Sequence, residues 1–220
     1  LDVWVATGDG DCFSIGAGHW VHALRYNMDM TVLVFDNGIY GLTKKQTSPT
    51  TPEAYQTNTH PGGALLPPLN PLTVTLGVTN ISFVAQMVDW NSPLLYETIK
   101  AAHAHKGTSF VRIVQRCPVF MDAMSDELID DPARLLLLNH EQGIPVPDGV
   151  SKLFENQIDH DPNDLSAALS LSTDRSKIPV GLLYRNPDAG LYNDLSSQGL
   201  DLTSEEKLAG VNEALDKYLI

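Results

Sequence analysis

Strand-like and helix-like stretches alternate over the first 120 residues, and few folds are compatible with that order. Four apolar runs have the length and composition of buried strands: residues 2–7, 31–35, 81–88 and 109–114. Two stretches with helical spacing or capping residues lie between them, at residues 15–26 and 93–105. Strands that alternate with helices in this way form a largely parallel sheet with helices on both faces. We therefore predict an α/β fold.

The pattern changes in the rest of the chain. Residues 46–71 hold six of the 14 prolines together with many Thr, Ser and Asn residues, which predicts a long loop without regular structure. Beyond residue 120 the expected elements are sparse: a helix within residues 125–139, a strand at residues 177–183 and a terminal helix at residues 204–219. We therefore divide the chain into a domain of residues 1–120 and an irregular C-terminal extension, residues 121–220.

Composition argues against several classes of function. The formal net charge is −13, and so acidic a surface repels phosphate backbones, which argues against nucleic-acid binding. No apolar run reaches membrane-spanning length, and the first residues lack the basic and apolar regions of a signal peptide. These features predict a cytoplasmic protein that does not bind a membrane. Two cysteines, Cys12 and Cys117, are too few for a disulfide framework or for a complete four-cysteine cluster site.

Side chains with oxygen ligands follow two of the predicted strands. Asp9 comes directly after the first strand, within Gly-Asp-Gly, and Asn37 follows the second. The carboxyl ends of parallel strands meet at one edge of the sheet, where α/β folds bind ligands. The Asp9 carboxylate, the Asn37 amide oxygen and the Ile39 carbonyl form a hard oxygen set that suits Mg²⁺ carrying a diphosphate. Gly8 permits the sharp turn that brings the backbone close to such a ligand.

Two other interpretations compete for the same residues. Asp-Gly is common in ordinary turns, so Gly-Asp-Gly alone is weak evidence. A calcium-binding loop is disfavoured because residues 12–15, Cys-Phe-Ser-Ile, lack the later oxygen ligands, and no closing Glu follows. The strand context and the spacing to Asn37 favour magnesium and a diphosphate.

Gly-Asp-Gly at residues 8–10, together with Asp-Asn at residues 36–37, resembles the thiamine-diphosphate motif, in which Asn-Asn stands at a similar spacing. The sequence departs from that motif at Asp36, where the family has Asn. The second Asn is the metal ligand in the family, so Asn37 matches the functional position. Asp36 adds a negative charge beside an anionic cofactor.

Residues 39–51 carry a more specific resemblance. Their sequence, Ile-Tyr-Gly-Leu-Thr-Lys-Lys-Gln-Thr-Ser-Pro-Thr-Thr, resembles the Tyr-Gly-Leu-Thr-Lys-x-Gln-x-Ser-Pro-Thr segment of the β subunits of 2-oxoacid:ferredoxin oxidoreductases. Residues 8–11, 15–25 and 115–120 resemble the same family. The chain is thus similar to the thiamine-diphosphate-binding subunit, with its N-terminal portion missing.

The resemblance implies a coenzyme A-dependent oxidative decarboxylation of a 2-oxoacid. In this family the β subunit binds thiamine diphosphate and Mg²⁺, and a 4Fe–4S cluster passes electrons to ferredoxin. The carboxylate that activates the cofactor comes from the α subunit, so the resemblance implies a chain that is inactive without that partner. The pattern at Leu42 and Lys44 favours 2-oxoglutarate over pyruvate.

Site residues can be carried over where the motifs match. The resemblance implies that Asp9, Asn37 and the Ile39 carbonyl hold Mg²⁺. The residues implied to contact thiamine diphosphate are Gly8, Asp9, Gly10, Asp11, Gly41 and Leu42. Lys44 is the candidate for the substrate carboxylate, because a flexible ammonium group supplies a point charge. A solvent-exposed loop lysine is the alternative for that position.

Cys117 stands before Pro118, after the last predicted strand of the first domain. In the family this cysteine is one of four ligands to the 4Fe–4S cluster, and the other three precede Gly-Asp-Gly in a segment that this chain lacks. A buried structural cysteine is the alternative. Cys12 is interpreted as a packed side chain.

Two competing functions remain open at this point. One is a non-oxidative thiamine-diphosphate decarboxylase or synthase, against which residues 42–50 and Cys117 argue. The other is a non-catalytic fragment that docks on an α subunit without binding cofactor.

Overall fold

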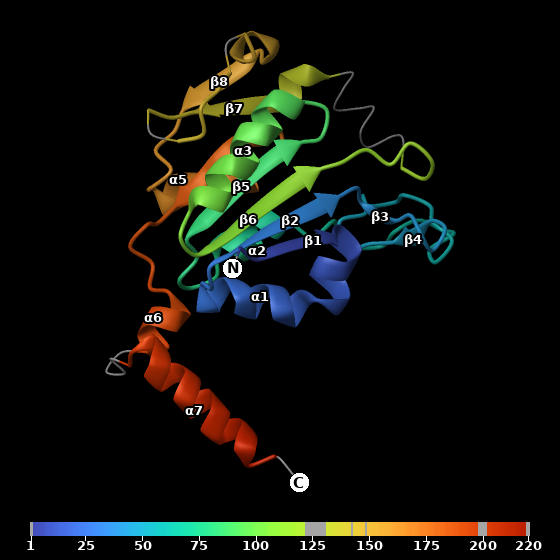
Figure 1. Ribbon diagram of the computed structural model, residues 1–220. Helices are drawn as coiled ribbons and strands as arrows, with labels where there is room; N and C mark the ends of the chain where they lie inside the picture. Colours follow the sequence, from blue (N-terminus) through green and yellow to red (C-terminus); the bar gives the residue numbers. More distant parts are fainter. Residues whose placement is uncertain (1, 122–130, 142, 148, 198–201, 219–220) are drawn as a thin grey trace.

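The computed structural model describes residues 2–121, 131–141, 143–147, 149–197 and 202–218. Within these ranges seven strands form one sheet in the spatial order β1-β2-β6-β5-β9-β7-β8 (Figure 1). The strands are β1 Trp4–Gly8, β2 Met30–Asp36, β5 Phe83–Val88, β6 Thr108–Val114, β7 Leu135–Asn139, β8 Asn156–Asp159 and β9 Ile178–Arg185. Neighbouring strands are parallel except β5 and β9, which are antiparallel. The predicted α/β fold with a mostly parallel sheet is confirmed.

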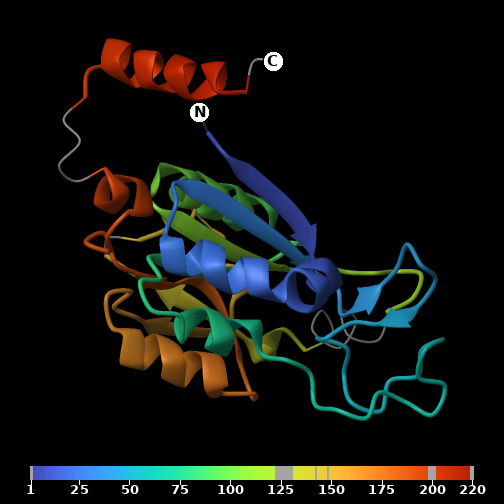
Figure 2. The same ribbon diagram turned by 90° about the horizontal axis from the view of Figure 1, so that it is seen from below.

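Helices cover both faces of the sheet, as predicted (Figure 2). α3, Ser92–Ala104, packs on one face against β5 and β6. α1, Ala17–Tyr26, α2, Pro71–Leu76, and α5, Leu165–Thr173, pack on the other face. The central strands β5, β6 and β9 are therefore buried between two apolar layers. Shorter elements are the π-helix Asp11–Ile15, β3 Ile39–Tyr40, β4 Gln46–Thr47, α6 Tyr192–Ser196 and the 3₁₀ turns Pro132–Arg134 and Ser151–Leu153.

Asparagine side chains cap the start of two helices. Asn91 accepts a hydrogen bond from the Leu94 backbone amide (3.3 Å) at the start of α3, which confirms the helix predicted at residues 93–105. Asn70 accepts one from the Leu72 amide (3.1 Å) at the start of α2. The sequence does not predict α2, because a helix of six residues at the end of a proline-rich segment is too short to show a period.

The C-terminal part is more regular than predicted. β7 occupies Leu135–Asn139, so the helix predicted for residues 125–139 is wrong there; the part before residue 131 lies outside the described residues. Leu137 is fully buried, because β7 lies between β8 and β9 and its apolar run fills the interior of the sheet. β9 confirms the strand predicted at residues 177–183. The division at residue 120 stays a prediction, and the sheet continues across it through the pairing of β5 with β9.

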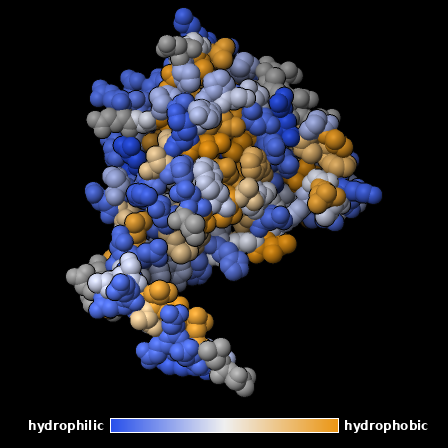
Figure 3. Space-filling model, viewed as in Figure 1, coloured by the Kyte–Doolittle hydropathy of each residue, from blue (hydrophilic) through white to orange (hydrophobic). Residues whose placement is uncertain are grey.

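The terminal helix is confirmed as α7, Ser204–Asp216. It begins with a capping box, in which the Glu206 amide donates to the Thr203 hydroxyl (3.2 Å) and the Thr203 amide donates to the Glu206 carboxylate (2.7 Å). α7 stands away from the sheet in Figure 1, and apolar surface is visible along it in Figure 3. Its exposed apolar side chains are Leu208, Val211 and Leu215. Among the described residues, no helix combines the length and the apolar character needed to cross a membrane.

Candidate functional site

The predicted metal-binding residues meet at the carboxyl edge of β1 and β2. These strands are parallel, with Gly8 paired to Phe35, so the residues that follow each strand emerge side by side. The Asn37 backbone amide donates a hydrogen bond to Asp9 Oδ1 at 3.4 Å. The structure therefore brings together Asp9 and Asn37, as the sequence predicts.

Asp9 is a buried carboxylate with only 2% of its surface exposed. Its Oδ2 atom accepts hydrogen bonds from the hydroxyls of Ser48 and Thr50, the latter at 2.9 Å. Burial raises the pKa of Asp9, the negative charge of Asp36 raises it further, and the pKa reaches about 6 although the hydrogen bonds lower it. A cation beside Asp9 would therefore be favoured, because it would compensate a buried negative charge.

Asp36, the residue that departs from the family motif, is fully buried and paired with Arg112. Arg112 donates from Nε (2.7 Å) and from Nη2 (2.6 Å) to Asp36 Oδ2. Asp36 Oδ1 accepts from the Thr50 hydroxyl (2.7 Å) and from the Gly38 amide (3.2 Å). The extra negative charge that the sequence places here is thus compensated within the protein.

The segment after β2 is folded by local hydrogen bonds. Asn37 Oδ1 accepts from the Ile39 amide at 3.1 Å, and Gly38 has a φ of 69°, a left-handed conformation that favours glycine. The Thr51 hydroxyl donates to the Gly38 carbonyl at 2.6 Å. The hydroxyls of the Ser-Pro-Thr-Thr segment, residues 48–51, therefore close over the end of β2.

Ser48, Thr50 and Arg112 are site residues that the sequence does not predict. Ser48 and Thr50 belong to the segment that resembles the family, and this was the available signal for them. Arg112 gives no such signal, because it lies outside the motifs, between apolar residues of strand β6.

Two glycines of the predicted cofactor set lie against other site residues. A side chain at Gly10 would overlap the ring of Tyr40, so the absence of a Cβ at Gly10 lets this ring pack on the backbone after β1. A Cβ at Gly41 would lie 3.7 Å from Cys117 Sγ. Cys117 is therefore close to the cofactor segment, and its thiol is partly buried, whereas Cys12 is buried and has a pKa raised by burial to about 12.

The lysines of the same segment differ in their surroundings. Lys44 is exposed, and both Lys44 and Lys45 have a φ of 65°. The Lys45 ammonium lies over the Tyr55 ring, 5.1 Å from its centre. Leu42 is 99% exposed. Lys44 and Leu42 are therefore both exposed to solvent in this chain.

The donor set at this edge suits a hard cation. The described residues contain no group of three or more His, Cys, Asp or Glu side chains that could hold a metal ion. A metal site here would instead combine one carboxylate, from Asp9, with the amide oxygen of Asn37 and the carbonyl of Ile39. Among the residues that the structure describes, Asp9 Oδ1 has only the long contact to the Asn37 backbone amide, so it is the oxygen best placed for a cation. Magnesium prefers oxygen ligands of this kind.

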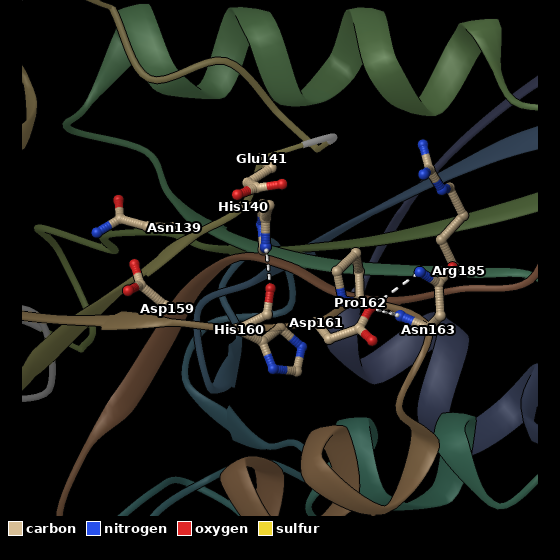
Figure 4. A pocket seen from close by; sticks show the side chains of 9 residues that line it. All are labelled: Asn139, His140, Glu141, Asp159, His160, Asp161, Pro162, Asn163 and Arg185. Atoms are coloured by element: carbon tan, nitrogen blue, oxygen red, sulfur yellow. Dashed lines mark hydrogen bonds between the residues drawn. The ribbon is translucent and has the colours of Figure 1, made fainter.

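A cavity of about 650 Å³ lies at the opposite edge of the sheet (Figure 4). Its walls come from the ends of β7, β8 and β9 and include His140, His160 and Arg185. His140 Nδ1 lies 3.1 Å from the His160 carbonyl. Since β9 runs antiparallel to β5, these strand ends lie far from Asp9, and no predicted cofactor residue lines the cavity.

Comparison with known proteins identifies the family. Residues 1–113 match the model of the thiamine pyrophosphate enzyme, C-terminal TPP binding domain. The chain belongs to this family. The match covers both elements of the site, from Asp9 to Arg112, and confirms the thiamine-diphosphate-binding fold.

The chain is also homologous to β subunits of 2-oxoacid:ferredoxin oxidoreductases. It is 42% identical to 2-oxoglutarate oxidoreductase subunit KorB of Mycobacterium tuberculosis, over 69% of this chain and 40% of that one. It is 34% identical to the 2-oxoacid:ferredoxin oxidoreductase subunit beta of Saccharolobus solfataricus, over 87% of this chain and 60% of that one. The chain thus spans about 40–60% of the length of these two relatives.

A solved structure resembles the whole chain. It is the 2-oxoglutarate:ferredoxin oxidoreductase from Magnetococcus marinus with 2-oxoglutarate, coenzyme A and succinyl-CoA bound. The TM-score is 0.74 at 34% sequence identity, and the match covers 96% of this chain and 67% of that one. The similarity therefore includes the C-terminal part, which lies beyond the residues that the family model matches.

Proposed function

We propose that the chain is the cofactor-binding part of a 2-oxoacid:ferredoxin oxidoreductase β subunit. The observation that carries the proposal is the buried Asp9 carboxylate, held beside Asn37 by hydroxyls of the Ser-Pro-Thr segment. The family match and the homologous β subunits support it. The reaction would be the coenzyme A-dependent oxidative decarboxylation of a 2-oxoacid.

In this proposal Asp9, Asn37 and the Ile39 carbonyl hold Mg²⁺, and the Gly-Asp-Gly turn and Gly41 border the diphosphate and thiazolium region. When bound, thiamine diphosphate would supply a nucleophilic carbon for the 2-oxoacid carbonyl and would take up the electron pair that stays behind when carbon dioxide leaves. The chain's own contribution is to bind and orient. Ser48 and Thr50 fix the Asp9 carboxylate, and a cation compensates its charge.

We also propose that Cys117 is a ligand of a 4Fe–4S cluster that passes electrons to ferredoxin. Its support is the position of its thiol beside Gly41, at the edge where the cofactor would lie. Cys12 is buried away from solvent, so the remaining ligands would come from other polypeptide. The partners in this proposal are the α subunit, ferredoxin, coenzyme A and the 2-oxoacid, and the cytoplasmic location stays a prediction.

Titration of thiamine diphosphate and Mg²⁺ into the protein tests the proposal. We expect saturable binding in calorimetry that disappears when the metal is removed with a chelator, because the diphosphate is held mainly through the cation. No binding at millimolar cofactor would contradict the proposal and favour the docking fragment. Binding without ferredoxin reduction by the assembled enzyme would favour a non-oxidative decarboxylase or synthase.

The proposed substrate is 2-oxoglutarate rather than pyruvate, with Lys44 beside the substrate carboxylate. Relatives named for 2-oxoglutarate support the substrate, and the place of Lys44 within the segment that resembles the family supports its role. We expect Lys44→Met to raise KM for 2-oxoglutarate about 10-fold in the assembled enzyme, the loss expected for one charge-assisted hydrogen bond. Lys45→Met is the matched control, since Lys45 lies over Tyr55. A lower KM for pyruvate than for 2-oxoglutarate in the unaltered enzyme would overturn the substrate assignment.

A further inference from the structure

A line of hydrogen-bonded polar side chains crosses four neighbouring strands of the sheet. It starts at Asp36 on β2 and continues to Arg112 on β6, which donates from Nη1 to Gln86 Oε1 on β5 at 2.8 Å. Gln86 Nε2 donates in turn to the Pro179 carbonyl on β9 at 2.8 Å. The line therefore connects the cofactor edge with the strand that the C-terminal part adds to the sheet.

These groups are buried where apolar side chains are the rule. Asp36 is 0% exposed and Gln86 is 1% exposed, and the Arg112 side chain is 19% exposed. A buried charge is strongly destabilising unless a partner compensates it and its remaining hydrogen-bonding atoms are satisfied. Arg112 meets both needs, because its planar fork binds Asp36 Oδ2 twice and reaches Gln86 with its third nitrogen.

The position of Asp36 determines the position of the metal-binding segment. Asp36 Oδ1 accepts from the Gly38 amide, between the two proposed ligands Asn37 and Ile39. The same oxygen lies 2.7 Å from the Thr50 hydroxyl oxygen, which also lies 2.9 Å from Asp9 Oδ2, so the two carboxylates share the single Thr50 proton. A shift of Asp36 would therefore move or release groups on both sides of the metal site.

We propose that Arg112 is a positioning residue for the bound Mg²⁺ and diphosphate, acting through Asp36 and oriented by Gln86. The inference rests on the proposed function and extends it to a residue outside the cofactor motifs. It also gives the departure at Asp36 a role. Asp36 contacts both the Gly38 backbone amide and the Thr50 hydroxyl, and the Arg112 guanidinium compensates its charge. Without the Arg112 guanidinium, Asp36 would be an uncompensated buried carboxylate beside Asp9.

The test compares Arg112→Gln with the double variant Asp36→Asn/Arg112→Gln. Calorimetry of thiamine diphosphate with Mg²⁺, on the subunit assembled with its partner, gives the Kd. We expect Arg112→Gln to weaken binding about 10- to 100-fold, the loss typical of groups that orient metal ligands. We expect the double variant to recover most of that loss, because an amide at position 36 needs no cation. If Arg112 serves stability alone, the two variants should differ in chemical unfolding while both folded variants bind the cofactor with the Kd of the unaltered protein.

Each outcome decides between the two proposals. If the unaltered protein does not bind the cofactor, the proposed function fails and this inference fails with it. Two outcomes with an unaltered protein that binds the cofactor would overturn only the inference. One is a double variant whose Kd is as high as that of Arg112→Gln, and the other is an Arg112→Gln variant whose Kd equals that of the unaltered protein. Should Arg112→Gln not fold by circular dichroism, Arg112→Lys replaces it. That variant keeps the charge but not the fork, so we expect weaker binding, and a Kd equal to that of the unaltered protein would overturn the inference.

Discussion

Asp9→Asn is expected to abolish Mg²⁺-dependent binding of thiamine diphosphate and, at the same time, to stabilise the unliganded protein. The affinity loss should exceed about 100-fold, because a direct ligand is removed and outer-shell partners alone cost about 10- to 100-fold. Asparagine keeps the shape of the side chain, and the Ser48 and Thr50 hydroxyls can turn to accept from its amide group. Calorimetry with the cofactor and chemical unfolding without it measure the two effects.

The stabilisation follows from the pKa of Asp9, which is raised from 3.8 to about 6 by burial and by Asp36. A raised pKa means that folding opposes ionisation, so the contribution of Asp9 to stability is fully present below pH 3.8 and is lost as the pH rises through 6. The shift corresponds to about 2–3 kcal/mol at pH 8. Asp9→Asn removes this loss. We therefore expect the free energy of unfolding of the variant to exceed that of the unaltered protein by about 2–3 kcal/mol at pH 8 and by little at pH 4.

Other groups titrate in the same pH range, and the comparison of Asp9→Asn with the unaltered protein separates their effect on stability from that of Asp9. His105 has a pKa lowered by burial to about 4, so its contribution to stability is lost as the pH falls through 4 in both proteins. The difference between variant and unaltered protein therefore isolates Asp9. Asp188→Asn is the control, since Asp188 is exposed and lies far along the chain from the site. Equal stability of Asp9→Asn and the unaltered protein at pH 8 would contradict the raised pKa.

Asn27→Ala is expected to lower the free energy of unfolding by about 3–5 kcal/mol, from an unfavourable backbone conformation and lost buried hydrogen bonds. Asn27 is fully buried and ends α1 with a φ of 49°. Its Oδ1 accepts from the Thr108 amide (2.8 Å) and the Ser82 hydroxyl (2.6 Å), and its Nδ2 donates to the Gly190 carbonyl (3.4 Å). One side chain thus ties together α1, β6 and the segment after β9.

Asn27→Gly separates the two causes. Glycine adopts the left-handed conformation without strain, so this variant loses the hydrogen bonds alone and should unfold at a higher denaturant concentration than Asn27→Ala. Cofactor affinity of the folded variants should be unchanged, because Asn27 lies at the edge of the sheet opposite Asp9. A loss below about 1 kcal/mol for Asn27→Ala, the size of one ordinary hydrogen bond, would show that the network does not hold the elements together.

The order of elements in the first 120 residues could be predicted because their signals are local. Buried parallel strands are continuous apolar runs, and the strand at residues 31–35, for example, is β2 with one more residue at each end. The helix predicted at residues 93–105 is α3, which begins at Ser92 directly after the capping residue Asn91. β7 was mistaken for part of a helix because a short apolar run has the same appearance in either structure, and only its place between β8 and β9 decides.

The proximity of Asp9 and Asn37 could be predicted from the chain, because residues that follow adjacent parallel strands emerge at the same edge. The groups around these two residues depend on the tertiary fold. The Ser48 hydroxyl reaches Asp9 across 39 residues, and Arg112 reaches Asp36 across 76. Such contacts depend on the order of strands in the sheet and on the path of a long loop, and neither leaves a periodic signal in the chain. The sequence motifs contain the carboxylates of the site, and the fold determines which groups compensate for their burial.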